Sequence, residues 1–171
     1  LRDEPRADQL AMARRAAEAV PVVPDFFAQA GLLLEQEGKD EAARASLERA
    51  LTLAKRSAGD ASAVAAMRGL VYAALARIEA RAGHGAAAKR WVAQGLRLAP
   101  DEQALWNAAW QIEPPRREDE AAFPPVLRTA FQESRPDPVT LAHWAAWQGH
   151  YALYQRIARE LVDQGIHLPE T

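Results

Sequence analysis

Small and apolar residues recur at helical spacing between Phe26 and Pro100, and the pattern occurs twice. The first occurrence consists of Phe27, Ala30, Gly31, Leu34, Gly38, Ala43, Leu47, Ala50, Leu51 and Leu53. The second consists of Tyr72, Leu75, Ala76, Gly83, Ala88, Val92, Gly95, Leu96, Leu98 and Pro100. Each occurrence predicts two antiparallel helices that cross where the side chains are small. Because a lone helical hairpin cannot bury its apolar face, two in succession predict a stack.

Prolines and glycines divide the first 112 residues into six predicted helices. These helices are expected over residues 8–20, 25–37, 40–57, 60–82, 86–98 and 102–112. Pro21 and Pro24 end the first helix, and Asp25 is expected to be the N-cap of the second. Gly38 and Gly83 are expected to stop the helices that precede them.

The composition changes after residue 112, where prolines and charged residues replace the helical pattern. The sequence predicts three parts: a repeat region over 1–112, a connector over 113–138 and a C-terminal helical cap over 139–171. A helix over 124–133 interrupts the connector, with an inward face of Val126, Leu127, Ala130 and Phe131. The cap is expected to be a hairpin of helices over 139–148 and 151–164. No stretch alternates as a strand would, so the predicted fold is all-α.

The two occurrences resemble the tetratricopeptide repeat family at their small crossing positions. These positions are Ala30, Gly31, Ala43 and Ala50, then Leu75, Ala76, Ala88 and Gly95. The family places a proline after the second helix, as Pro100 stands here. The resemblance implies a right-handed α-solenoid whose concave groove binds another polypeptide.

The chain departs from the family pattern at two points. Glu79 stands where the family usually has a large apolar residue, and Ala76 follows Gly31 by 45 residues rather than the usual ~34. Extended hairpin helices or an inserted turn would accommodate this offset. The alternative is a general α-helical bundle with alanine-rich contacts.

The C-terminal hairpin is similar to an ankyrin repeat in a few positions. The similarity rests on Thr140, His143, Ala145, Ala146, Gly149 and His150. One such unit cannot form an ankyrin stack, so the hairpin is interpreted as a cap on the solenoid.

Charge and composition exclude several classes of function. The net charge is −2, with 21 basic and 23 acidic residues, which argues against nucleic acid as a partner. The chain has no cysteine, so disulfides, thiolate catalysis and cysteine-based zinc sites are excluded. Its longest apolar run is too short to span a bilayer. The sequence does not distinguish a bacterial cytoplasm from a periplasm.

Candidate catalytic and metal sites are weak. His143 and His150 lack a carboxylate at metal-ligand spacing, so hydrogen bonds that fix their turn are the expected role. The serines do not stand in a nucleophile motif. Glu118, Asp119 and Glu120 are expected to be a solvated charge run in the connector. We therefore expect no enzyme activity, no metal and no cofactor.

The favoured hypothesis is a scaffold or adaptor that binds another protein or a peptide in a preformed concave groove. A membrane-associated or secretion assembly of a bacterium is one setting for such a protein. The candidate groove residues are Gln29, Leu32, Glu35, Arg77, Arg81 and Asn107. Arg77 and Arg81 are four residues apart, so they share a helix face and could grip a carboxylate or a phosphorylated segment. The alternative is a solvated face in which they pair with Glu79 and neighbouring acids.

The tryptophans support a second hypothesis. Trp106 with Trp110, and Trp144 with Trp147, are spaced to share helix faces. Core packing explains such pairs, and so does anchoring of a partner. An inhibitor or immunity-type protein that blocks an enzyme would use a surface of Trp144, Trp147 and Tyr151. A third hypothesis is an enzyme or small-ligand binder with a pocket between solenoid and cap.

Overall fold

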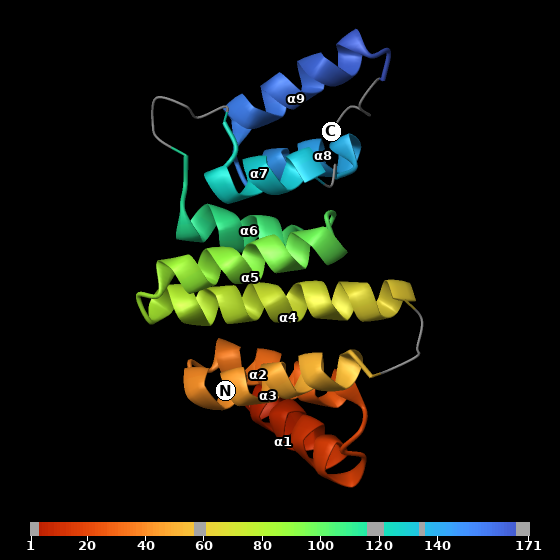
Figure 1. The fold of residues 1–171 in the computed structure, drawn as a ribbon, viewed down its shortest axis with the longest axis vertical. Helices are drawn as coiled ribbons and strands as arrows, with labels where there is room; N and C mark the ends of the chain where they lie inside the picture. Colours follow the sequence, from red (N-terminus) through yellow and green to blue (C-terminus); the bar gives the residue numbers. More distant parts are fainter. Residues whose placement is uncertain (1–3, 57–60, 116–121, 134–135, 167–171) are drawn as a thin grey trace.

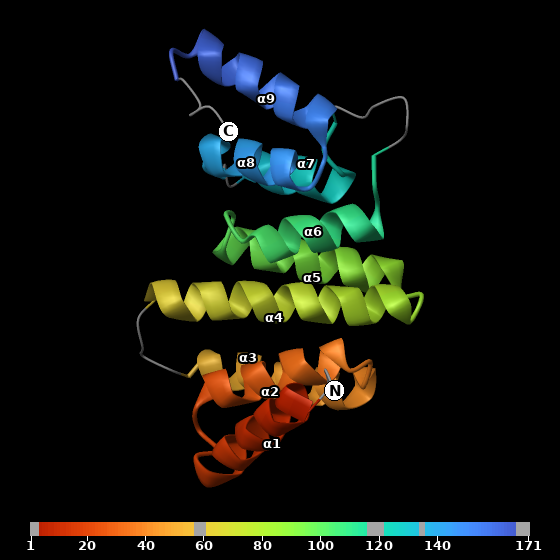
Figure 2. The same ribbon diagram turned by 180° about the vertical axis from the view of Figure 1, so that it is seen from behind.

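The structure is a computed structural model that describes residues 4–56, 61–115, 122–133 and 136–166. All regular secondary structure in these ranges is α-helical, with nine helices and no strand. The helices follow one another in layers along the long axis of the molecule, from α1 at one end to α9 at the other (Figure 1). The view from behind shows the same order (Figure 2). The predicted all-α fold is confirmed for the described residues.

The N-terminal layers consist of α1 (Glu4–Ala19), α2 (Pro24–Gln36) and α3 (Asp40–Ala54). Helices α2 and α3 pack together as a hairpin, and α1 packs on α2. Gly38 has a φ of 72° in the turn between α2 and α3, a left-handed conformation that L side chains rarely adopt. The predicted stop at Gly38 is therefore confirmed.

The predicted N-cap of α2 is wrong. The cap residue is Val23, which makes no side-chain hydrogen bond to the helix. Pro24 is the first helical residue, where its fixed φ suits the helix and its missing N–H costs nothing. Asp25 lies instead in the first turn, where a negative charge interacts favourably with the helix dipole.

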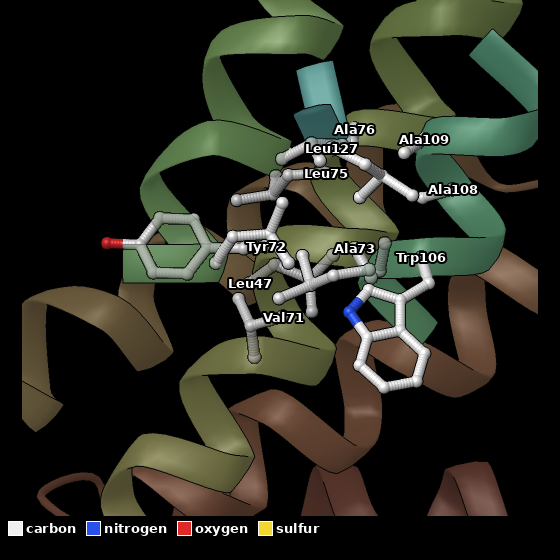
Figure 3. Packing of buried hydrophobic residues seen from close by; sticks show 14 of the residues in the cluster. Leu47, Val71, Tyr72, Ala73, Leu75, Ala76, Trp106, Ala108, Ala109 and Leu127 are labelled. Carbon is white, nitrogen blue, oxygen red and sulfur yellow. The ribbon is translucent and has the colours of Figure 1, made fainter. Parts of the chain in front are cut away.

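The central layers consist of α4 (Ala61–Arg81), α5 (Gly85–Leu98) and α6 (Gln103–Ile112). Helix α4 forms a hairpin with α5, and it also contacts α2, α3 and α6. Leu47 of α3 and Trp106 of α6 lie in one buried cluster with Val71 and Leu75 of α4 (Figure 3). This position makes α4 the central element of the core.

Two glycines stand where the helices cross closely. A Cβ added to Gly31 of α2 would lie 2.6 Å from Cγ of Leu47 in α3. A Cβ added to Gly95 of α5 would lie 2.6 Å from Cδ2 of Leu105 in α6 and 3.0 Å from Cβ of Tyr72 in α4. The two 2.6 Å distances are too short for carbon atoms, so a side chain at either position would require Leu47 or Leu105 to shift. The small crossing positions predicted from the sequence are confirmed at these two residues.

The C-terminal layers consist of α7 (Pro125–Glu133), α8 (Pro138–Trp147) and α9 (Tyr151–Asp163). Helix α7 packs on α5 and α6, and α8 forms a hairpin with α9. Trp144 of α8 lies edge-on to Trp106 of α6, with ring centroids 5.4 Å apart. Buried residues from Leu10 to Leu161 form one continuous cluster. The division of the chain at residues 112 and 138 stays a prediction.

Candidate partner-binding surfaces

The six residues predicted to line one groove lie on three helices, α2, α4 and α6. Glu35, Arg77 and Arg81 meet where α2 and α4 pack together. Gln29 lines a cavity of about 200 Å³ between α1 and α2, and Leu32 is partly buried against the core. Asn107 lies on α6, where its Oδ1 accepts a hydrogen bond from Trp144. The structure therefore brings Glu35, Arg77 and Arg81 together, and a single groove that includes all six residues stays a prediction.

Glu35 and Asp40 hold the two arginines in an ion-pair cluster. Arg77 donates from Nε and Nη2 to the two carboxylate oxygens of Glu35, at 3.2 and 3.0 Å. Arg81 donates from Nη1 to Glu35 Oε1 at 2.8 Å. The same guanidinium donates twice more to Asp40, at 3.1 and 2.7 Å. Such bidentate pairs are among the strongest hydrogen bonds in proteins.

The electrostatics of this cluster favour the charged forms of Glu35, Asp40 and Arg81. Glu35 is only 8% exposed, and burial alone would raise its pKa. Hydrogen bonds from Arg77 and Arg81, with their positive charges, outweigh that burial and hold the pKa of Glu35 below its ordinary value. The hydrogen bond from Arg81 likewise lowers the pKa of Asp40, and the bond to Asp40 raises the pKa of Arg81.

A second ion-pair cluster surrounds Glu79, the residue that departs from the repeat pattern. Its carboxylate accepts from Arg44 of α3 and lies 2.8 Å from Nδ1 of His84. Glu79 is 6% exposed, so an acidic residue occupies an interior position. The two partners explain how this charge is accommodated, because buried charges require pairing.

These contacts correct the sequence-based view of Arg77 and Arg81. Their expected pairing with Glu79 is wrong, since their acidic partners are Glu35 and Asp40. Both guanidiniums are engaged within the protein rather than held ready for a partner's carboxylate. Beside them lies a cavity of about 270 Å³, lined also by Ala80, Gln111 and Ile112.

The alternative surface of Trp144, Trp147 and Tyr151 is only partly exposed. Trp144 is 1% exposed, and its Nε1 donates to Asn107 Oδ1 at 2.8 Å. The prediction that Trp144 lies on an accessible surface is therefore wrong, because its indole fills the space between α6 and α8. Trp147 is 89% exposed and Tyr151 is 67% exposed. These two remain available to a partner.

His150 stabilises the α8–α9 turn by stacking rather than by the expected side-chain hydrogen bond. Its ring lies 3.7 Å from the centroid of Trp110, nearly parallel to it. Desolvation at this site lowers the pKa of His150. Backbone bonds close the turn, from His150 N to Ala145 O at 2.8 Å and from Gly149 N to Ala146 O at 3.1 Å.

One surface feature was not predicted: an open groove between α5 and α7, with a volume of about 500 Å³. We call it the α5–α7 groove. Its lining residues are Lys89, Arg90, Ala93, Arg97, Glu113, Pro125, Val126, Thr129, Ala130 and Glu133. At its edge, Lys89 Nζ lies 2.7 Å from a carboxylate oxygen of Glu113.

The sequence contained part of the signal for this groove. Val126 and Ala130 were predicted to face inward, and Arg90 and Arg97 are seven residues apart, about two helical turns. The missing information was that α7 packs beside α5. Helix α6 and the first part of the connector lie between these two helices in the chain, so no local pattern indicates their contact.

Metal and membrane sites were also sought in the described part of the chain. It contains no group of three or more His, Asp or Glu side chains placed to hold a metal ion. Among its helices, none combines the length and hydropathy needed to cross a membrane. The predicted charge run at Glu118, Asp119 and Glu120 lies outside the described residues.

Comparisons with known proteins were made at three levels. Family models, curated proteins and solved structures all gave no match to this chain. The resemblance to tetratricopeptide repeats therefore rests on the residues alone.

Proposed function

We propose that this protein is a non-catalytic scaffold or adaptor that binds another polypeptide in the α5–α7 groove. In this proposal its hairpins are tetratricopeptide-like units stacked as a right-handed α-solenoid. The succession of contacts supports the stack, because α2 packs on α4 and α4 on α6. Nearest-neighbour packing of this kind is typical of repeat proteins.

The openness of the groove is the observation that carries the functional part of the proposal. Of its ten lining residues five are exposed, and only Ala130 is buried. Small-molecule sites usually cover about 70–90% of their ligand, which an open groove between two helices does not do. A polypeptide suits such a groove better, since it continues over the rims and contacts exposed side chains there.

The packing of both walls indicates that the groove exists before a partner binds. Val92 and Leu96 anchor α5 in the core, and Leu127 anchors α7, each at most 1% exposed. Helices held this firmly move little on association. The main cost of binding is then the freedom that the partner itself loses.

Site-specific crosslinking tests this function. A photoreactive residue replaces the exposed Thr129 in the groove, and in a second variant it replaces the exposed Glu48 on α3. In cells that naturally produce the protein, we expect a discrete protein adduct from position 129 and none of that mass from position 48. Identical adducts from both positions, or none from position 129, would contradict the proposal.

A second candidate function keeps the hypothesis of an inhibitor or immunity-type protein. It is favoured by the exposure of Trp147 and Tyr151, because aromatic side chains are frequent binding hot spots. A photoreactive residue at position 147 tests it in the same experiment. A protein adduct from position 147, with no adduct from position 129, would favour this candidate.

A further inference from the structure

The charges around the α5–α7 groove indicate the chemistry of its partner. We propose that the groove binds an acidic segment of a partner protein, with apolar side chains between its carboxylates. This inference rests on the proposed function and specifies the occupant of the same site.

The cations of the groove come from one helix. Lys89, Arg90 and Arg97 all belong to α5, and the carboxylates of Glu113 and Glu133 are the acidic groups of the lining. Lys89 is paired with Glu113. Arg90 and Arg97 are exposed and form no ion pair within the described part of the chain. These two guanidiniums are the groups that can receive a partner's carboxylates.

The spacing of the two arginines matches an amphipathic segment. Seven residues of α-helix place them about 10 Å apart along α5. Ala93 lies between them on the same wall, and Val126 and Ala130 form part of the opposite wall. A partner segment would therefore place a carboxylate near each arginine and apolar side chains against the strip between them. Arginine suits this role because its planar group binds carboxylates in a bidentate manner.

The attraction is local to the groove. The whole chain has a net charge of −2, so the molecule as a whole does not attract acidic ligands. The groove has three cations against two carboxylates. The carboxylate of Glu133 repels an acidic partner, so we expect that removal of the Glu133 charge strengthens binding.

Polypeptide is favoured over single-stranded nucleic acid, the other anionic polymer. Bases need aromatic side chains on which to stack, and none lines this groove. Its apolar lining comes instead from alanine, valine and proline, which suit aliphatic side chains.

Fluorescence anisotropy with defined probes tests the inference. The probes are labelled helical peptides with two glutamates seven residues apart and leucines between them, in several registers, with lysine-for-glutamate versions of each. We expect the acidic peptides to bind the full chain, and to bind less tightly when salt shortens the Debye length from ~10 to ~5 Å. The lysine versions should not bind.

Variants locate the binding site. The double variant Arg90→Glu with Arg97→Glu should weaken binding by at least about tenfold, because two attractive contacts become repulsive. Arg159→Glu, on the exposed side of α9, is the matched control and should bind as the wild type does. Glu133→Gln should bind more tightly than the wild type. Circular dichroism confirms that each variant is folded.

Several outcomes would overturn the acidic partner. The acidic peptides could fail to bind in every register, or the protein could bind the lysine peptides more tightly. Arg159→Glu could also weaken binding as much as the double variant does. Tighter binding of an oligothymidylate that depends on Arg90 and Arg97 would replace the polypeptide with nucleic acid. If the acidic peptides fail while position 129 still crosslinks a protein in cells, this inference fails and the scaffold function stands. If both fail, the scaffold function fails too.

Discussion

At the residue scale, Glu35 and Glu79 are the buried acidic residues of the described chain, and each has two side-chain partners. Glu35 receives Arg77 and Arg81, and Glu79 receives Arg44 and the imidazole of His84. Taking a carboxylate out of water costs several kcal/mol unless charged partners compensate. The positions of these glutamates are therefore possible only because α3 and α4 bring cations to them.

The close crossing at Gly31 gives a prediction about packing. Gly31→Ala should lower the free energy of unfolding by about 1–3 kcal/mol, because the new methyl group would overlap Leu47 and force α2 and α3 apart. Urea unfolding followed by circular dichroism measures the change.

Gly85→Ala is the matched control for that substitution. Gly85 begins α5, and an added Cβ would meet no atom within 4 Å. The better helix propensity of alanine should leave stability unchanged or raise it by up to about 1 kcal/mol. Equal losses in the two variants would show that the crossing is not the cause.

The stacked ring of His150 predicts a dependence of stability on pH. Desolvation lowers the pKa of His150 below its ordinary 6.5, so the unfolded chain binds the proton more readily than the folded one. The contribution of His150 to stability is therefore present above this pH and is lost as the pH falls towards the folded pKa. His150→Phe keeps the stack on Trp110 and removes the titration. On acidification below pH 6.5, the unfolding temperature of this variant should fall less than that of the wild type. Parallel plots of unfolding temperature against pH for the two proteins would contradict this explanation.

At the element scale, α4 shows how burial on all sides changes a helix. Six consecutive residues, 71–76, are all buried, from Val71 at 0% to Tyr72 at 8% exposed. A helix covered on several sides needs apolar residues around its whole circumference. Helix α4 meets this requirement with three alanines and one leucine between Tyr72 and Arg77. The small alanines allow α2, α3, α5 and α6 to approach it together.

Helix α8 depends on its cap, because it is only 10 residues long. Asp137 Oδ2 accepts from the backbone N–H of Thr140 at 2.7 Å and from the Thr140 hydroxyl at 2.6 Å. These hydrogen bonds hold the pKa of Asp137 below its ordinary value.

The cap at Asp137 gives a prediction for α8. Asp137→Ala should cost about 1 kcal/mol of unfolding free energy, because one N–H of the first turn loses its acceptor. Asp137→Asn keeps an acceptor oxygen and should remain close to the wild type. Chemical denaturation of the three proteins measures this, and equal losses in both variants would assign the effect to charge instead.

At the scale of the whole molecule, charged side chains join the N-terminal layers to α4. Within the described residues, the ion pairs of this junction connect Glu35 of α2, or Asp40 and Arg44 of α3, to the last turns of α4. The packing of α4 against the α2–α3 hairpin therefore depends on charge as well as on apolar contact.

Removal of the central carboxylate tests this junction. Glu35→Gln should lower the free energy of unfolding by about 2 kcal/mol near pH 7, because Arg77 and Arg81 lose a charged acceptor. Urea unfolding measures the loss, and the exposed Glu48→Gln is the control that should change little.

Comparison of the wild type with Glu35→Gln also measures how the stability of this junction depends on pH. The pKa of Glu35 is lower in the folded chain than its ordinary 4.5. Its stabilising contribution is thus present above pH 4.5 and is lost as the pH falls through the folded pKa. The advantage of the wild type over Glu35→Gln should therefore shrink in that acidic range. An advantage that persists undiminished there would contradict the ionic role.

The local features of the fold were predictable from the sequence. The helices lie close to their predicted ranges because apolar periodicity and turn glycines act over a few residues. Gly31 and Gly95 were correctly identified as crossing positions, because only small residues allow a close approach. The predicted cap, Asp25, lies two residues after the actual cap, Val23, because a proline and an acidic residue side by side both signal a helix start.

The candidate site was predicted less well than the helices. The sequence identified Glu35, Arg77 and Arg81 as candidate residues but did not predict that they pair. Glu35 is 42 residues from Arg77 and 46 from Arg81 in the chain. The sequence showed that these groups are charged and share helix faces, and it did not show which opposite charge would meet them. Trp144 was misjudged for the same reason, since the helix that covers it was unknown.

By itself, the sequence determined the helices, the turns between them and the positions where two helices touch closely, since each depends on the nearest few residues. Only the tertiary structure decided which charges neutralise one another, which tryptophans are covered and where α7 meets α5 to form a groove. The physical reason is that periodicity marks the face of a helix that must be covered. The partner that covers it comes from a distant segment and depends on how all the helices pack at once.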